Sequence, residues 1–398
     1  MRKTDNLMPT LQSSFIQGFF WANFCAIFVY AAKYMLDSGL TNSIIGVVIA
    51  CGSALSAVMQ PIVGAWADRS RRMIIRRLIN GTAGFMILLC CVLLLPETGS
   101  AITVAVTYAL LIAALQIITP LTYSLSMFFS ERGVRINFGV SRAAGSLTYA
   151  GASALLGILV EKYSTAAVPC SIIVLCVLLI LSVSTFRFKG IDECNSTDAA
   201  RSSRRSIFEF FKNHRRFTIV LFGNILLFIS YNIISNYSYQ IFSYHGYGSS
   251  EMGIAISFAA VMELPTLFLL SKINRKFASG ALLKFSAVFI FIKIFLLFLA
   301  KDLTMILVAM GTQIFGYALF AGISVYYVTH SVEQENLSLG QSLMTMTITV
   351  GAVLGSLLGG RLLDAASVPV LLGAASGFAL LGAVIICLAA EKGKTEAA

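Results

Sequence analysis

The chain has 398 residues, of which 58% are hydrophobic and only 12% are charged, and its mean hydropathy is +0.85. Soluble domains carry roughly twice that share of charge, so the composition excludes a water-soluble globular protein. A formal net charge of +11 would suggest nucleic-acid binding in a soluble protein. In a membrane protein the position of each basic residue matters more than the sum. We therefore expect a lipid bilayer, and no nucleic acid, as partner.

Apolar runs long enough to span a membrane recur along the whole chain. A spanning helix needs about 20 residues, because it rises about 1.5 Å per residue across a hydrocarbon core of about 30 Å. The runs form two sets of six, separated by a polar stretch from 188 to 216. We predict spans at about 13–36, 43–66, 73–95, 100–128, 138–160, 167–187, 217–242, 252–270, 281–300, 303–329, 340–362 and 369–390.

This pattern predicts an all-α integral membrane protein with twelve transmembrane helices in two pseudo-symmetric six-helix bundles. The predicted domains are an N-terminal bundle at 1–187, a cytoplasmic linker at 188–216 and a C-terminal bundle at 217–398. Two such halves are typical of alternating-access carriers, whose substrate site lies between them near the midplane of the membrane. A membrane scaffold that carries no solute is the structural alternative. We expect a monomer.

Basic residues set the predicted orientation, because Lys and Arg are retained on the cytoplasmic side. With both termini in the cytoplasm, 23 of the 29 Lys and Arg residues lie in cytoplasmic segments. We predict a multi-pass protein of the cell inner membrane with cytoplasmic N- and C-termini. The first apolar run has no small-residue cleavage site after it, so we expect a retained span rather than a signal peptide.

The residues offer little for catalysis or for a bound metal. The eight cysteines show no Cys-x-x-Cys spacing, and seven of them lie in apolar stretches, so we expect buried thiols without a disulfide or metal framework. The three histidines, His214, His245 and His330, lie far apart near predicted helix ends. We therefore expect no cofactor and no enzymatic activity. A transport-derived sensor or a membrane enzyme is the alternative from another class.

Three charged residues lie well inside predicted spans. Glu263 is about 12 residues into the eighth span, which places it roughly 18 Å along that helix. Lys293 lies at a comparable depth in the ninth span, and Arg142 lies inside the fifth. Charges at such depth are functional by default, because they cost several kcal/mol unless they are paired or face a wet cavity. The structural alternative is a static Glu263–Lys293 ion pair that joins two helices.

Polar residues at helical spacing predict a cavity lined by several spans. Arg142, Ser146 and Tyr149 share one face of the fifth span, and Asn232 and Asn236 share one face of the seventh. The tenth span adds a polar stripe that begins at Gln313. Stripes of small and polar residues also serve tight helix packing, which is the alternative for each of them.

The loop after the second span resembles a motif of the major facilitator superfamily, GxxxDRxGRR. It reads Gly64-Ala-Trp-Ala-Asp68-Arg69-Ser-Arg71-Arg72, with Arg71 where the family has a glycine. The resemblance implies the major facilitator fold. It also implies a conformational latch at the cytoplasmic helix ends, made by Gly64, Asp68, Arg69 and Arg72. A simple positive-inside loop is the alternative.

Within that superfamily, several segments resemble the lactose permease group of oligosaccharide/proton symporters. The segment Phe138-Gly139-Val-Ser-Arg142-Ala-Ala-Gly145 resembles its motif FGxxRxxG, and Met262-Glu263-Leu264 resembles its eighth-helix segment. The resemblance implies that Arg142 and Glu263 bind sugar hydroxyls and that Tyr149 stands where a tryptophan stacks on the sugar ring. Lys293 falls at an arginine, which keeps the charge without the bidentate fork.

Departures from that group put its galactoside specificity in doubt. Its proton-relay histidine and glutamate fall at Gln313 and Gly316, which do not titrate, and the glutamate that partners its arginine falls at Ser124. The aspartates of its seventh helix fall at Asn232 and Ser235, and the lysines that neutralise them fall at Met310 and about Ile348.

We therefore expect a secondary active transporter that works by alternating access and takes up a sugar, oligosaccharide or glycoside with protons. Glu263 is the expected titrating group. The alternatives are proton-coupled efflux of amphipathic drugs, and uptake of another small solute such as an organic acid or nucleoside. The predicted solute-binding residues are Arg142, Tyr149, Glu263, Lys293, Asn232, Asn236 and Gln313.

Overall fold

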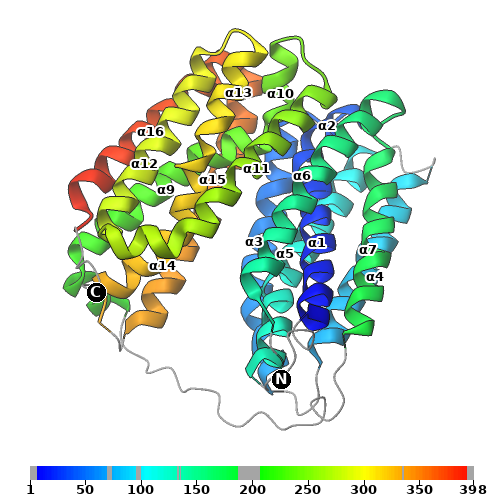
Figure 1. Ribbon diagram of the computed structural model, residues 1–398. Helices are drawn as coiled ribbons and strands as arrows, with labels where there is room; N and C mark the ends of the chain where they lie inside the picture. The colour runs from blue at the N-terminus through cyan, green and yellow to red at the C-terminus, as the bar shows by residue number, and fades with distance from the viewer. Residues whose placement is uncertain are drawn as a thin grey trace. The chain divides into compact units, whose positions relative to one another are not determined.

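The computed structural model describes residues 7–69, 74–95, 100–131, 134, 136–186, 207–333 and 336–391. Throughout this described part the regular elements are helices (Figure 1), so the all-α prediction is confirmed. In chain order they are α1 (Leu7–Val29), α2 (Ala31–Asp37), α3 (Asn42–Arg69), α4 (Ile75–Leu94), α5 (Ala101–Glu131), α6 (Phe138–Lys162), α7 (Ala167–Thr185), α8 (Ile207–Asn213), α9 (Arg215–Asn236), α10 (Ser238–Tyr244), α11 (Ser249–Lys276), α12 (Ser279–Leu299), α13 (Leu303–Gly311), η3 (Thr312–Ile314), α14 (Tyr317–Ser331), α15 (Leu337–Ala365) and α16 (Val368–Ala389).

The helices account for every predicted span. Among the described residues, eleven helices are long and apolar enough to cross a membrane, and the pair α1 and α2, bent by 45°, forms a twelfth. The prediction of twelve spans is therefore confirmed. Three of the predicted spans are interrupted, at Tyr30, at Tyr237 and at Thr312–Ile314.

The chain divides into two compact units, which are described separately. The first comprises Met1–Arg201 and Tyr247–Ser257, and the second comprises Ser202–Gly246 and Phe258–Ala398. Helix α11 thus supplies its first turns to one unit and the rest to the other. In the first unit α1 packs against α5, α6 and α7, and α3 packs against α5. In the second unit α9 packs against α15 and α16, and α12 packs against α14 and α16.

The first span of each unit breaks at a fully buried tyrosine. Tyr30 separates α1 from α2, and Tyr237 separates α9 from α10. The Tyr30 hydroxyl donates to the carbonyl oxygen of Ser153 in α6 at 2.5 Å, and the Tyr237 hydroxyl donates to that of Ser356 in α15 at 2.6 Å. A buried phenol needs such a partner. The two units therefore repeat one device for holding a bent span against a neighbouring helix.

A glycine one turn beyond each serine makes room for the tyrosine. A Cβ atom built at Gly157 would lie 3.1 Å from the Tyr30 hydroxyl oxygen, and one built at Gly359 would overlap the ring of Tyr237. Close packing leaves no free volume into which a buried aromatic ring can retreat. Even alanine at either position would therefore displace the tyrosine.

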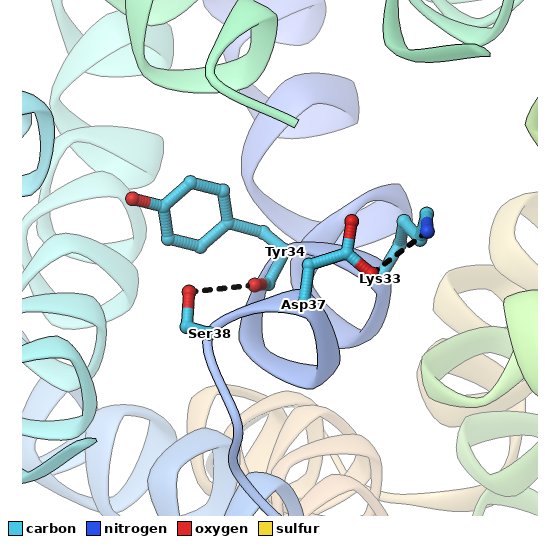
Figure 2. A network of polar contacts seen from close by, with 4 residues as sticks. All are labelled: Lys33, Tyr34, Asp37 and Ser38. Carbon is cyan, nitrogen blue, oxygen red and sulfur yellow. Dashed lines mark hydrogen bonds and ion pairs between the residues drawn. The ribbon is translucent and has the colours of Figure 1, made fainter. Parts of the chain in front are cut away.

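Helix α2 carries a charged pair within one turn. Lys33 Nζ lies 2.8 Å from Asp37 Oδ1, and the Ser38 hydroxyl donates to the Tyr34 carbonyl oxygen at 2.9 Å; Figure 2 shows both contacts. The pair is partly exposed, and such i, i+4 pairs contribute only about 0.3–0.5 kcal/mol. Lys33, one of the cations inside the predicted spans, therefore has a partner at the end of its own helix.

Two segments that position functional groups differ from the sequence prediction. Helix α8 (Ile207–Asn213) lies inside the predicted linker, and its Phe210 ring is buried against the rings of His214 and Phe217. Burial of this aromatic ring anchors the helix, and the polar composition of the linker hid that signal. The tenth span is interrupted by the 3-10 turn η3, which holds Gln313 between α13 and α14.

Candidate functional site

Gln313 lies at the centre of a polar cluster in the second unit. Its amide oxygen accepts a hydrogen bond from Lys293 Nζ at 2.6 Å, and its amide nitrogen donates to Glu263 Oε1 at 2.8 Å. The same nitrogen donates to the Tyr231 hydroxyl at 3.2 Å. Lys293 and Gln313 are buried, with 8% and 4% of their surface exposed. Glu263 and Lys293 are therefore linked through a neutral amide.

Four helical segments bring these groups together. Tyr231 comes from α9, Glu263 from α11, Lys293 from α12 and Gln313 from η3. The 3-10 turn matters here, because it departs from α-helical spacing at the residue that bridges the acid and the base. We call Tyr231, Glu263, Lys293, Gln313 and Tyr317 the Gln313 cluster.

Two aromatic rings form one side of the Gln313 cluster. The rings of Tyr231 and Tyr317 stack with centroids 4.8 Å apart and planes 16° apart. The Lys293 ammonium lies 5.5 Å from the centroid of Tyr231, within the range of a cation–π interaction. The cluster thus combines an ammonium, a carboxylate and an amide, which supply hydrogen-bond donors and acceptors, with aromatic faces.

Asn232 and Asn236 of α9, which were predicted to bind solute, form hydrogen bonds to residues outside the Gln313 cluster. Asn232 Nδ2 donates to the Phe228 carbonyl oxygen of its own helix at 2.8 Å. Asn236 is buried and its Nδ2 donates to Ser356 Oγ in α15 at 2.9 Å. These contacts favour helix packing for Asn236, and they bind the Asn232 amide to its own helix.

Arg142 anchors a second cluster, which belongs to the first unit. Its guanidinium carbon lies 4.2 Å from the centroid of the Trp21 ring, and its Nη1 donates to Ser146 Oγ at 3.0 Å. Tyr123 of α5 also interacts with the Arg142 side chain. Tyr149 reaches this group through Trp21, with ring centroids 6.5 Å apart and an edge-on geometry. We call Arg142, Ser146, Tyr149 and Trp21 the Arg142 cluster.

Close packing fixes the position of Trp21. A Cβ atom at Gly145 would lie 2.6 Å from Trp21 Cδ1, so only glycine lets the indole lie along α6 at this height. One turn earlier in α1, Gln17 is fully buried, and neither its amide nitrogen nor its oxygen has a partner in the described part of the chain. A buried amide without partners is costly, so Gln17 is a further candidate for contact with water or solute.

Sequence reasoning missed Trp21, Tyr123, Tyr231 and Gln17. Trp21 is one of only two tryptophans in the chain, and Tyr231 directly precedes the predicted Asn232. Those were the available signals. The rest depends on which helices pack together, and helical spacing within one span does not contain that information.

The predicted latch falls at the edge of the described residues. Gly64 lies half-exposed in α3, and Asp68 and Arg69 lie in its last turn, with side chains outside the described set. Arg72 lies outside the described residues altogether. Within the part that the structure describes, no three His, Cys, Asp or Glu side chains gather as metal ligands would.

Comparison with known proteins identifies the type of protein. The family model described as the MFS_1 like family matches residues 13–371. No curated protein sequence is significantly similar to this chain. Many solved structures share its fold, including the nucleoside transporter NupG, with a TM-score of 0.77 at 13% identity over 96% of this chain and 98% of that chain.

Two further solved structures extend this similarity. An auto-inhibited peptide transporter of the POT family has a TM-score of 0.74 at 11% identity, with 97% of each chain covered. A bacterial homologue of the human lysosomal transporter Spinster has a TM-score of 0.66 at 15% identity, with 98% of each chain covered. At such identities the likeness concerns the fold.

Proposed function

This chain belongs to the MFS_1-like family, and we propose that it takes up a sugar, oligosaccharide or glycoside together with protons. The chain is a multi-pass membrane protein and a secondary transporter of the major facilitator type, which moves a small solute across a lipid bilayer. The solute class and the coupling ion are what we add.

The single observation that carries the proposal is the Gln313 cluster. Sugar hydroxyls both donate and accept hydrogen bonds, and Lys293, Gln313 and Glu263 offer donors and acceptors in one chain of contacts. The Tyr231 and Tyr317 rings add flat apolar surface beside them. A few convergent polar groups beside aromatic side chains are typical of small-molecule sites.

The Arg142 cluster supports the same solute class. Arg142 lies in a motif that resembles the one carrying the sugar-binding arginine of the lactose permease group. Its guanidinium lies over the Trp21 ring, and its Nη1 donates to Ser146. A guanidinium held in this way keeps further N–H donors for hydroxyl groups. In this proposal Trp21 takes the stacking role first expected of Tyr149, and Tyr149 supports the indole from its edge.

Glu263 is the group that we propose to couple solute to protons. It is the acid of the Gln313 cluster, and its neighbour Gln313 does not titrate. When Glu263 is ionised, the cluster holds one negative and one positive charge. When Glu263 is protonated, Lys293 remains as an uncompensated cation, which favours a solute that can bring acceptor oxygens. Protonation and solute binding are thus expected to support each other.

The experiment is uptake by the purified full chain in proteoliposomes. Radiolabelled disaccharides, aryl glycosides, nucleosides, an organic acid and an amphipathic cation are each offered with and without an inward proton gradient. We expect accumulation of a hydroxylated solute above equilibrium only when the gradient is present. Accumulation of that solute that ignores the gradient refutes proton coupling. Transport of the amphipathic cation alone would instead indicate drug efflux.

Nucleoside uptake is the second candidate, because the NupG structure covers nearly the whole of both chains. A nucleoside presents ribose hydroxyls and a flat base, which the Gln313 cluster and the Tyr231–Tyr317 stack could bind respectively. Competition separates the candidates. If a nucleoside displaces labelled glycoside but free ribose does not, the base contributes to recognition and the nucleoside is the better substrate.

We also propose that Gly64, Asp68, Arg69 and Arg72 act as the conformational latch implied by the loop motif. An acid at the end of one helix beside a basic turn can pair with neighbouring helix ends in one state and release them in another. An Asp68→Asn variant is expected to bind solute normally and to transport it slowly.

A further inference from the structure

A cavity of 330 Å³ lies in the second unit, at the junction of α8, α9, α14 and the end of α16. Its volume lies within the range of small-ligand sites, and none of its residues belongs to the Gln313 cluster. It is lined by Lys212, Asn213, His214, Arg215, Arg216, Phe217, Tyr327, Ser331 and Glu391.

The charge of this cavity favours an anion. Lys212, Arg215 and Arg216 face one carboxylate, that of Glu391, which leaves a net charge of +2 with His214 neutral. Arg216 Nη1 lies 2.8 Å from Glu391 Oε1, and both side chains are largely exposed. Exposed ion pairs of this kind are weak, so an incoming anion can compete with Glu391 for Arg216.

The depth of the cavity favours a lipid headgroup. Three candidate spans end at it: α9 starts at Arg215, the tenth span ends at Ser331 and α16 ends at Ala389, two residues before Glu391. The ends of spanning helices lie at the level of lipid headgroups. Basic pockets between membrane helices at this level are typical sites for anionic headgroups.

The walls of the cavity are held by aromatic packing. The buried rings of Phe217 and Tyr327 stack with centroids 6.3 Å apart and planes 24° apart. Phe210 of α8 packs edge-on against Phe217 and stacks on His214 at 4.6 Å. Helix α8 is therefore fixed to the base of α9, so that Lys212 stands beside Arg215 and Arg216. This rigidity reduces the entropic cost of binding a ligand.

We propose that this cavity binds the phosphate group of an anionic phospholipid headgroup. The ammonium of Lys212 and the guanidinium of Arg215 bind the phosphate oxygens, with Arg216 shared between the lipid and Glu391. The rings of Phe217 and Tyr327 are buried beneath these groups, so recognition rests on the three cations. The site lies on the surface that faces the membrane boundary and is independent of the transported solute.

Native mass spectrometry of the full chain in detergent tests this proposal, with phosphatidylglycerol as the probe and phosphatidylcholine as the neutral comparison. Each removed cation is expected to weaken phosphatidylglycerol binding about fivefold, so that Lys212→Ala/Arg215→Ala weakens it roughly 25-fold. The matched control, Lys301→Ala/Arg361→Ala, removes two exposed cations from the other ends of the spans in the same unit. It is expected to bind as the unmodified chain does.

Glu391→Gln is expected to change phosphatidylglycerol binding in the opposite direction. It keeps the shape of the side chain and removes the competing carboxylate, so phosphatidylglycerol binding is expected to strengthen severalfold. A purely structural role for the Arg216–Glu391 pair would instead weaken binding. Equal binding by the unmodified chain, Lys212→Ala/Arg215→Ala and the control overturns the proposal. Equal competition by millimolar inorganic phosphate assigns the cavity to a soluble phosphate ester and overturns the lipid assignment.

Discussion

The two polar clusters solve the problem of a cation inside a membrane helix in different ways. In the Arg142 cluster the guanidinium lies on the face of Trp21 and donates to a serine hydroxyl. In the Gln313 cluster the ammonium donates to an amide, and the amide donates to a carboxylate. In the Arg142 cluster the cation interacts with the face of an aromatic ring. In the Gln313 cluster the cation is linked to a carboxylate through the amide of Gln313. Of the two clusters, the Gln313 cluster is the one with a carboxylate, Glu263, that can take up a proton.

Replacement of Glu263 is expected to have the largest effect, because it removes the carboxylate that distinguishes the Gln313 cluster from the Arg142 cluster. We expect Glu263→Gln to abolish accumulation driven by a proton gradient, while the variant still exchanges solute across the membrane at equilibrium. The amide keeps a hydrogen-bond acceptor for Gln313 Nε2 and removes the titrating proton. Counterflow of labelled solute and uptake under an imposed gradient measure the two activities in the same proteoliposomes. Glu333→Gln, which neutralises an exposed acid, is the matched control. Unchanged gradient-driven uptake in Glu263→Gln would assign coupling to another group.

Removing the bridge is expected to have the next largest effect. Gln313→Leu keeps a similar volume and leaves Lys293 Nζ and Glu263 Oε1 without their amide partner. Unsatisfied buried groups cost about 1–3 kcal/mol each, so both solute affinity and the thermal unfolding midpoint are expected to fall.

A double-mutant cycle sharpens this prediction. If Lys293 depends on the bridge, Lys293→Met/Gln313→Leu should cost less in unfolding free energy than the two single changes added together. Additive costs would mean that the two side chains act independently, and the link through Gln313 described for this cluster would be wrong.

Solute affinity is expected to depend on the position of the Arg142 guanidinium over Trp21 more than on its positive charge. Arg142→Lys keeps the positive charge and loses the flat contact with Trp21, so solute affinity should fall by about 0.5–2 kcal/mol, the range of a cation–π contact. Gly145→Ala should give a similar loss, because the new methyl group displaces the indole. In a Trp66→Phe background Trp21 is the remaining tryptophan, and its emission reports the displacement. An unshifted spectrum in Gly145→Ala would contradict the packing argument.

The smallest effect is expected at Lys33. Its pair with Asp37 is partly exposed and lies within one helical turn, so Lys33→Met should lower the free energy of unfolding by no more than about 0.5 kcal/mol. Transport should be unchanged. Loss of gradient-driven uptake in this variant would show that a fourth charged position, beside Arg142, Glu263 and Lys293, takes part in the cycle.

The fold was largely predictable because hydropathy acts over about 20 consecutive residues, and every predicted span lies on a helix. The interruptions were not predicted. The run around Tyr30 stays apolar, and the polar residues around Tyr237 were assigned to one face of a continuous helix. Each tyrosine hydroxyl donates to a carbonyl of another helix, which the sequence does not show. Glu263, Lys293 and Arg142 stood out as charges in apolar surroundings. Their partners Trp21 and Tyr231 did not, since aromatic residues are ordinary in membrane helices. The solute-binding roles themselves stay predictions.

The buried tyrosine at the bend in the first span of each unit indicates how the molecule evolved. Tyr30 with Ser153 and Gly157, and Tyr237 with Ser356 and Gly359, occupy corresponding places in the two units. The polar clusters, in contrast, give their cations different hydrogen-bond partners: a serine hydroxyl for Arg142, and for Lys293 an amide that is itself bound to a carboxylate. A duplicated ancestral bundle would leave this record, in which the bend is inherited by both copies and the binding groups diverge afterwards. New solute specificity can then arise in one copy without rebuilding the frame that both copies share.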